Sequence, residues 1–144
     1  MVPEVCRQVL LKNPGSVAQW LRSPVDGTFV GVCVAFKALL NGFHAGCRPV
    51  IGLDGCHMKG KFGGITLSLV AIDGNNGLFP IGIYLCRGET RENYETFLRI
   101  LKPHLIKHNQ PLTFMSDMSK GIIEAVKDVF PSSYHRFCFR HMYV

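Results

Sequence analysis

Two aspartates, Asp54 and Asp117, each follow a short run of apolar residues. The runs cover residues 50–53 and 111–115, and their length indicates buried strands. If the two strands are parallel neighbours, both carboxylates lie near one edge of a sheet. They would then offer hard oxygen ligands to Mg²⁺ or Mn²⁺, which keep positions for water and phosphates. The alternative is that each aspartate only caps a strand or turn, as we expect of Asp73 in its asparagine and glycine setting.

A thiol and an imidazole stand three positions apart near the end of the chain, at Cys138 and His141. This Cys-x-x-His spacing allows both side chains to reach one Zn²⁺. A structural zinc requires four ligands, and the candidates for the others, provided that folding brings them close, are His135, Cys47, Cys56 and His57. The alternative is a buried cysteine beside a histidine that faces solvent or DNA.

Basic side chains surround both groups. His57 and Lys59 follow Asp54 on what we interpret as a loop, and Arg136 and Arg140 accompany Tyr134 and His135 near the end of the chain. Such side chains can contact DNA phosphates, which gives affinity that is independent of sequence and falls with salt. A solvated basic edge is the alternative for each pair.

The elements that position these residues follow from hydrophobic spacing and turn signals. We expect helices at residues 5–12, 35–43, 90–107 and 119–129, and strands at residues 17–21, 29–32, 50–54, 65–72, 78–87, 111–115 and 134–139. Thr90 is the expected N-cap of the longest helix, and Gly42 is expected to close the second helix. The Asp, Asn and Gly residues at 73–77 form a hairpin turn.

This order of elements predicts an α/β fold with a mixed sheet: an antiparallel three-strand meander, parallel strands added to it, and helices on its faces. We expect two parts in the chain. Residues 1–46 form an N-terminal extension of helix, hairpin and helix, and residues 47–144 form the core.

Composition excludes several classes of protein. With 144 residues, 47% hydrophobic and 18% charged, the chain fits one compact domain rather than a disordered one. Its longest apolar stretches, residues 29–34 and 65–72, are shorter than the about 20 residues of a membrane helix. Glu4 and Arg7 interrupt any signal-peptide pattern, so we expect an intracellular protein whose six cysteines are mostly buried thiols. A net charge of +6 favours polyanions only weakly.

Short segments in a fixed order run through almost the whole chain. They are residues 13–16, 42–60, 73–81, 116–121, 124–126, 129–131 and 135–141, including Gly-Leu-Asp-Gly-Cys-His at 52–57 and Cys-Phe-Arg-His at 138–141. Together these segments resemble the transposase domain of plant Mutator-like elements. Each segment alone is a weak signal, but their joint order and spacing are specific to that family.

The resemblance implies a ribonuclease H-like fold in which three D-D-E carboxylates hold two Mg²⁺ or Mn²⁺ ions for DNA strand cleavage and transfer. The family's first acid falls on Asp54, which would bridge both ions, and its second acid falls on Asp117. The expected partner is DNA and the expected compartment is the nucleus. Whether the full-length protein forms a homo-oligomer is left open.

The chain departs from the family pattern at the third acid. The family's glutamate lies beyond the Cys-x-x-His motif, whereas this chain stops at Val144. Glu124 matches a different family position, and we prefer a solvated or structural role for it. We therefore expect the isolated chain to be inactive or nearly so. The alternatives are a domesticated DNA-binding or transcription-related protein, and a zinc-dependent interaction module that would leave the two aspartates unexplained.

Overall fold

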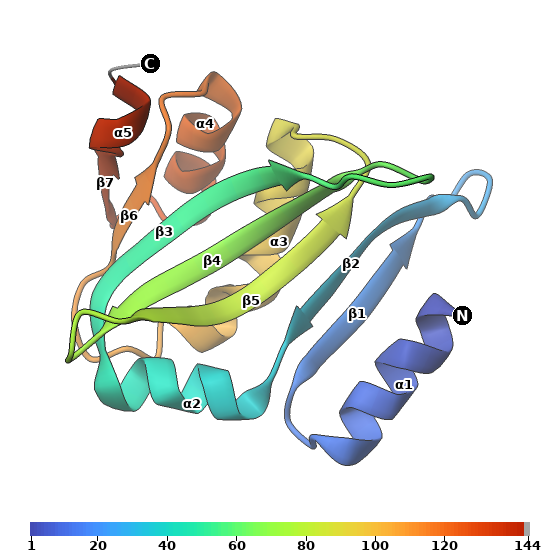
Figure 1. Cartoon of the computed structure of the whole chain (residues 1–144), viewed down its shortest axis with the longest axis horizontal. Coiled ribbons are helices and arrows are strands. Elements are labelled where there is room, and N and C mark those ends of the chain that lie inside the picture. Colours follow the sequence, from blue (N-terminus) through green and yellow to red (C-terminus); the bar gives the residue numbers. More distant parts are fainter. Residues whose placement is uncertain (143–144) are drawn as a thin grey trace.

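The computed structural model describes the backbone of residues 1–142 and the side chains of residues 1–140 (Figure 1). The elements are, in order, α1 (Val2–Lys12), β1 (Val17–Arg22), β2 (Phe29–Ala35), α2 (Lys37–Gly46), β3 (Cys47–His57), β4 (Ile65–Asp73), β5 (Leu78–Cys86), α3 (Arg91–Leu105), β6 (Thr113–Ser116), α4 (Lys120–Val129), β7 (Tyr134–Phe137) and the short α5 (Phe139–Met142). The expected succession of helices and strands is confirmed, with α5 as an addition.

One mixed sheet holds all seven described strands, in the order β1-β2-β5-β4-β3-β6-β7. Strands β3, β4 and β5 form the expected antiparallel meander. Strand β6 pairs parallel to β3, with Val50 opposite Thr113, and β7 pairs parallel to β6. The α/β fold with an antiparallel meander and parallel additions is therefore confirmed. The strand that contains Asp54 and the strand that leads to Asp117 are parallel neighbours, as expected.

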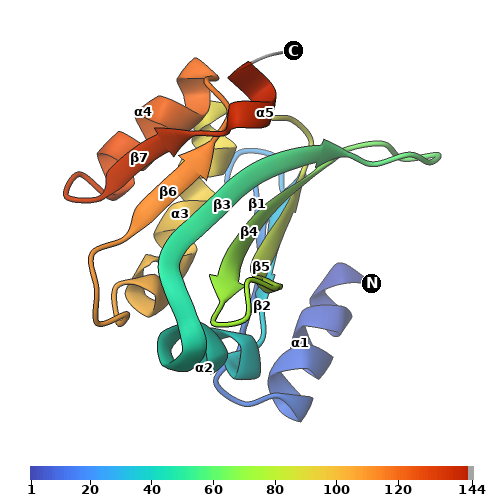
Figure 2. The ribbon, with the colours of Figure 1, turned by 60° about the vertical axis from the view of Figure 1, so that its left-hand side comes forward.

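The N-terminal hairpin belongs to the same sheet, because β2 pairs antiparallel with β5. Helix α1 lies on the opposite side of the sheet from α3 and α4 (Figure 2). Residues 1–46 thus form helix, hairpin and helix as expected, and their hairpin extends the meander by two strands. The division of the chain at residue 46 stays a prediction.

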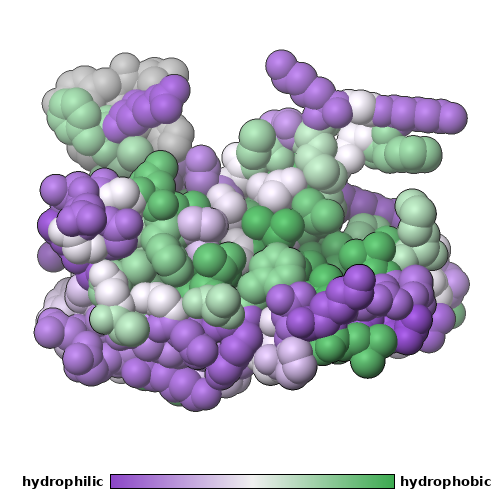
Figure 3. Space-filling model, turned by 60° about the horizontal axis from the view of Figure 1, so that its bottom comes forward, coloured by the Kyte–Doolittle hydropathy of each residue, from purple (hydrophilic) through white to green (hydrophobic). Residues whose placement is uncertain are grey.

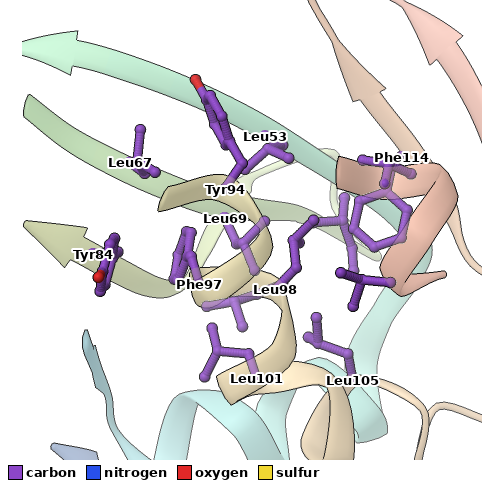
Figure 4. Packing of buried hydrophobic residues seen from close by; sticks show 14 of the residues in the cluster. Leu53, Leu67, Leu69, Tyr84, Tyr94, Phe97, Leu98, Leu101, Leu105 and Phe114 are labelled. Carbon is purple, nitrogen blue, oxygen red and sulfur yellow. The ribbon is translucent and has the colours of Figure 1, made fainter. Parts of the chain in front are cut away.

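Helix α3 supplies much of the core (Figure 4). The side chains of Phe97, Leu98 and Leu101 have no exposed surface, and the ring of Phe97 stacks on that of Tyr84 with 5.8 Å between centroids. Full burial of an apolar side chain of this size contributes about 1.5–3 kcal/mol. Thr90 caps the helix as expected, since its hydroxyl accepts a hydrogen bond from the Asn93 amide at 3.2 Å. This cap fixes where the connection from β5 enters α3.

The opposite face of the sheet is less covered. Asp54, Ser68, Ile83 and Val34 form one row across β3, β4, β5 and β2. Ile83 is 39% exposed in the middle of this row. The space-filling view from below shows apolar side chains gathered between polar ones (Figure 3). Asp54 therefore projects from a sheet face that solvent reaches.

Several boundaries differ from the expectation by a few residues, and three of the differences concern the packing or the site. Helix α2 continues past Gly42 to Gly46. A Cβ atom at Gly42 would lie 2.6 Å from the Phe79 ring, so this glycine permits close packing against β5 rather than ending the helix. Strand β3 runs three residues beyond Asp54, because its last residues pair with the start of β4. Strand β7 ends at Phe137, two residues earlier than expected, before α5 begins.

None of the helices within the described residues is long and apolar enough to cross a membrane. All six cysteines are free thiols. Cys6, Cys33 and Cys86 are buried, two more are half-buried, and Cys56 is exposed, so the expectation that most are buried is met for half of them.

Candidate functional site

Asp54 lies within β3, and Asp117 is the first residue after β6, the parallel neighbour of β3. Gly52 of β3 pairs with Met115 of β6, and each aspartate stands two residues further along the chain. The negative charges of both aspartates raise the pKa of the same buried side chain, Tyr94. The structure therefore brings together two residues that are far apart in sequence. Asp54 lies inside β3, so the interpretation that it ends this strand is wrong.

Both carboxylates accept hydrogen bonds from nearby backbone amides. Asp54 Oδ1 accepts from the Gly55 amide at 2.9 Å, and Asp117 Oδ1 accepts from the Ser119 amide at 2.9 Å. Asp54 is exposed and Asp117 is half-buried. Within the described residues, neither carboxylate forms an ion pair with a basic side chain. Both acids therefore keep oxygen lone pairs for a cation.

Strand β6 holds Asp117 in place through its neighbour β7. Ser116, which is 3% exposed, is hydrogen-bonded to His135 Nε2 at 2.7 Å, and its backbone carbonyl accepts from the Cys138 amide at 2.7 Å. Burial lowers the pKa of His135, so the imidazole is neutral at neutral pH. The residue before Asp117 is thus fixed by both its side chain and its backbone.

A tyrosine and a glutamate that the sequence reasoning missed lie beside the two aspartates. The Tyr94 hydroxyl donates a hydrogen bond to Glu89 Oε1 at 2.5 Å. Burial raises the pKa of Tyr94, the hydrogen bond to Glu89 raises it further, and the negative charges of Glu89, Asp117 and Asp54 add to the rise. Three carboxylates are therefore within electrostatic reach of one hydroxyl. The sequence signal that could have identified Glu89 is its position in a strand-to-helix connection, directly before the Thr90 N-cap.

The donor set fits a hard divalent cation. Mg²⁺ is bound in proteins through one or two carboxylates and keeps several waters. Asp54 and Asp117 supply that chemistry from β3 and from the end of its parallel neighbour β6. As the side chains stand, no three His, Cys, Asp or Glu residues of the described part of the chain form a metal-ligand group. The structure therefore offers two carboxylate ligands rather than a complete set of protein ligands.

Glu124 belongs to a different cluster. Its carboxylate lies 2.8 Å from Arg91 Nη1, and the same guanidinium pairs with Glu95 at 2.8 Å and with Asp128. Arg91 begins α3, whereas Glu124 and Asp128 lie on α4. These contacts tie α3 to α4, in agreement with the structural role preferred for Glu124.

The residues considered for zinc are spread over the sheet. Cys138 is half-buried between β7 and α5, and the side chain of His141 lies outside the described part of the structure. Cys47 and Cys56 stand nine residues apart on one strand, which is about 30 Å at the rise of an extended chain. These two cysteines do not share an ion. The pair of Cys138 and His141 stays a prediction.

The basic residues considered for DNA contact are all exposed. Arg136 pairs in register with Met115, so it projects from the same sheet face as Met115. His57 is the last residue of β3 rather than part of a loop, which corrects the expectation, and Lys59 lies in the connection to β4. Arg140 lies in α5. The structure thus places Arg136 on β7, next to the strand that leads to Asp117.

Comparison with known proteins identifies the family. The family model of the MULE transposase domain matches residues 50–144, which include both aspartates. The protein FAR1-RELATED SEQUENCE 6 of Arabidopsis thaliana is 30% identical over 96 residues, which are 65% of this chain. The chain spans 13% of the length of that relative. On the family match over residues 50–144, the chain belongs to the MULE transposase domain family.

Proposed function

We propose that this chain is part of a ribonuclease H-like transposase core in which Asp54 and Asp117 hold Mg²⁺ or Mn²⁺ against DNA. The observation that carries the proposal is the parallel register of β3 and β6, which brings Asp54 in β3 and Asp117 just after β6 into neighbouring positions. Membership of the MULE transposase domain family supports it. Cleavage and strand transfer would be activities of the full-length protein.

The roles of the residues follow from their chemistry. Asp54 and Asp117 would bind the cation through hard oxygens and hold it at the sheet edge. The chemistry that such an ion supplies is stabilisation of charge on a phosphodiester and a lower pKa for bound water. Arg136, on the strand next to β6, would contact a neighbouring phosphate and orient the DNA strand.

Metal binding tests this proposal without requiring activity. We expect Mn²⁺ titration, followed by the electron paramagnetic resonance signal of free Mn²⁺, to show one or more sites in the purified chain. Asp54→Asn and Asp117→Asn should each weaken binding by about tenfold or more, because each removes one charged ligand. Glu124→Gln is the matched control, since its carboxylate is paired with Arg91. Unchanged binding in both aspartate variants would contradict the proposal.

DNA is the proposed partner and the nucleus the proposed compartment. His57, Lys59, Arg136 and Arg140 are the side chains proposed to meet phosphates. Arg136→Ala should weaken binding to duplexes of unrelated sequence equally and reduce the salt dependence by about one phosphate contact. A variant with unchanged salt dependence would remove Arg136 from the proposed interface. We also propose that the full-length protein self-associates. Its molar mass, measured by light scattering, would test this proposal.

A second candidate is a domesticated DNA-binding or transcription-related protein that has the fold without catalysis. It is favoured by the lack of a formed three-ligand group among the described side chains. The full-length protein with a labelled duplex and Mn²⁺ separates the candidates. Cleavage that is lost in Asp117→Asn supports the transposase, whereas DNA binding without cleavage supports the domesticated protein.

A zinc ion held by Cys138 and His141 is a separate proposal, resting on their Cys-x-x-His spacing. Protein purified without added zinc should contain nearly one zinc per chain, and Cys138→Ser should lose it. The control is Cys33→Ser, because Cys33 is fully buried in the core. Zinc content that does not depend on Cys138 would contradict this proposal.

A further inference from the structure

The connection between β3 and β4 carries basic and aromatic side chains out beyond the sheet (Figure 2). We call residues 58–64 the β3–β4 tip; its two lysines, Lys59 and Lys61, are exposed. From residue 55 to residue 72 the chain contains no acidic residue. Neither lysine forms an ion pair within the described residues. The tip is therefore a positively charged projection that follows the strand containing Asp54.

Phe62 is the aromatic residue of the β3–β4 tip, and it is 93% exposed. Full burial of a phenylalanine side chain contributes about 1.5–3 kcal/mol, which the fold does not gain at this position. Lys61 Nζ lies over the Phe62 ring, 5.7 Å from its centroid. An aromatic ring and an ammonium group therefore stand together in solvent, as contact with a nucleobase and its phosphate requires.

Backbone hydrogen bonds give the β3–β4 tip a defined course. The Met58 amide donates to the Gly64 carbonyl at 2.9 Å, and the Gly63 amide donates to the Gly60 carbonyl at 3.3 Å. Gly63 and Gly64 have φ angles of 58° and 102°, which residues with a side chain rarely adopt. A turn that is closed in this way presents the Phe62 ring at a smaller entropy cost than a flexible loop does.

A hollow of about 650 Å³ lies beside the β3–β4 tip. Phe62 and Arg87 line it, and Phe29, Val32 and Leu85 form part of its apolar wall. Arg87 follows β5 directly, is exposed, and forms no ion pair within the described residues. The hollow thus combines an aromatic ring, apolar side chains and a guanidinium group, which are the groups that bind a base and its phosphate.

We propose that the β3–β4 tip binds an unpaired base of DNA: Phe62 stacks on the base, and Lys61 and Arg87 contact the phosphates beside it. The inference rests on the proposed function, which makes DNA the partner of this chain. Stacking on an aromatic ring tolerates every base, because each base has a π-face. Paired bases inside a duplex stack on one another and leave no free face for Phe62. The tip therefore selects single-stranded or locally opened DNA.

Binding of the purified chain to a labelled single-stranded oligothymidylate of about 12 nucleotides, measured by fluorescence anisotropy, tests the proposal. Phe62→Ala should weaken binding by roughly fivefold to a hundredfold, the effect of losing one stacked base, and Phe62→Trp should keep the wild-type affinity. Binding of Phe62→Ala to a fully paired duplex should stay within about twofold of wild type, because the phosphate contacts remain. Leu78→Ala is the matched control, since Leu78 is 80% exposed at the other end of β5.

The comparison of variants also excludes a structural role and a protein partner. Because Phe62 is exposed, Phe62→Ala should keep the wild-type unfolding midpoint. Equal weakening on the oligothymidylate and the duplex overturns the proposal, as does a loss in Leu78→Ala as large as that in Phe62→Ala. Unchanged DNA affinity with a lower molar mass in light scattering assigns the tip to a contact between copies of the chain and overturns it too.

Failure of this inference is distinguishable from failure of the proposed function. If Asp54→Asn loses Mn²⁺ binding while Phe62→Ala binds the oligothymidylate like wild type, only this inference is overturned. A wild-type chain that binds neither DNA also overturns this inference, and the Mn²⁺ titration then decides the two-aspartate site separately. Phe62→Ala should bind Mn²⁺ with wild-type affinity, which shows that its loss of DNA binding does not come from the aspartates.

Discussion

Two clusters of carboxylates flank the start of α3, and they differ in what neutralises them. In the Arg91 cluster, one guanidinium pairs with Glu95, Glu124 and Asp128. In the sheet-edge cluster, Asp54 and Asp117 form no ion pair within the described residues, and both raise the pKa of Tyr94.

The contrast distinguishes a structural use of acids from a binding use. A carboxylate that already has a cationic side chain within reach gains little from an added ion, and the network ties two helices together. Carboxylates without such a partner repel one another and bind a cation more readily. A count of acids therefore does not identify the site, whereas the position of their counter-charges does.

The largest expected effect removes the support that both clusters share. Helix α3 carries Arg91 and Tyr94, and Phe97 anchors the helix in the core with no exposed surface. Phe97→Ala should lower the free energy of unfolding by about 3–5 kcal/mol. Urea denaturation followed by circular dichroism measures the change. A loss below about 1 kcal/mol would show that α3 is not held by this residue.

A saturating divalent ion should act on only one of the two clusters. At a Mn²⁺ concentration about 100-fold above Kd, the folded state gains about 2.7 kcal/mol, because the ion binds the folded chain. We expect this gain to disappear in Asp117→Asn and to persist in Glu124→Gln. Thermal unfolding with and without Mn²⁺ measures it. A gain lost in both variants would remove the distinction between the clusters.

A small effect is expected from breaking one pair of the Arg91 cluster. The side chain of Glu124 is 35% exposed, and ion pairs at such sites contribute about 0.2–1 kcal/mol. Glu124→Gln should lower the free energy of unfolding by that amount, and 1 M NaCl should reduce the difference from wild type. A difference that does not respond to salt would point to packing instead of charge.

The smallest effect sharpens the role of strand β7 beside Asp117. Burial lowers the pKa of His135 below its ordinary value of 6.5, so the folded state binds fewer protons than the unfolded state. Stability should fall as the pH drops from about 6.5 through the folded-state pKa of His135. His135→Asn should flatten this slope in part, because burial also lowers the pKa of His104. An identical slope in wild type and variant would contradict the assignment.

Helices and strands were predictable where their buried residues recur at the regular spacing of a helix or a strand. The helix α3 and the strands β4 and β5 show their apolar spacing locally, and Thr90 caps α3 as its residue type indicates. The prediction that Gly42 ends helix α2 was wrong. Glycine often ends a helix, whereas here it accommodates the ring of Phe79 from β5. The end of β3 was missed because its last residues carry no apolar pattern and are held by pairing with β4.

The sequence by itself determined the two strands that lead to Asp54 and Asp117, the α/β class, and the motif order that identifies the family. These properties depend on residue type and local spacing. Tertiary structure decided that the strands leading to the two aspartates are parallel neighbours, that Glu124 is paired with Arg91, and that Glu89 lies against Gly55 and accepts the hydroxyl of Tyr94. The physical reason is that the opposite charges and the close contacts come from other helices and strands. The spacing of residues along the chain does not tell how near those elements lie in space.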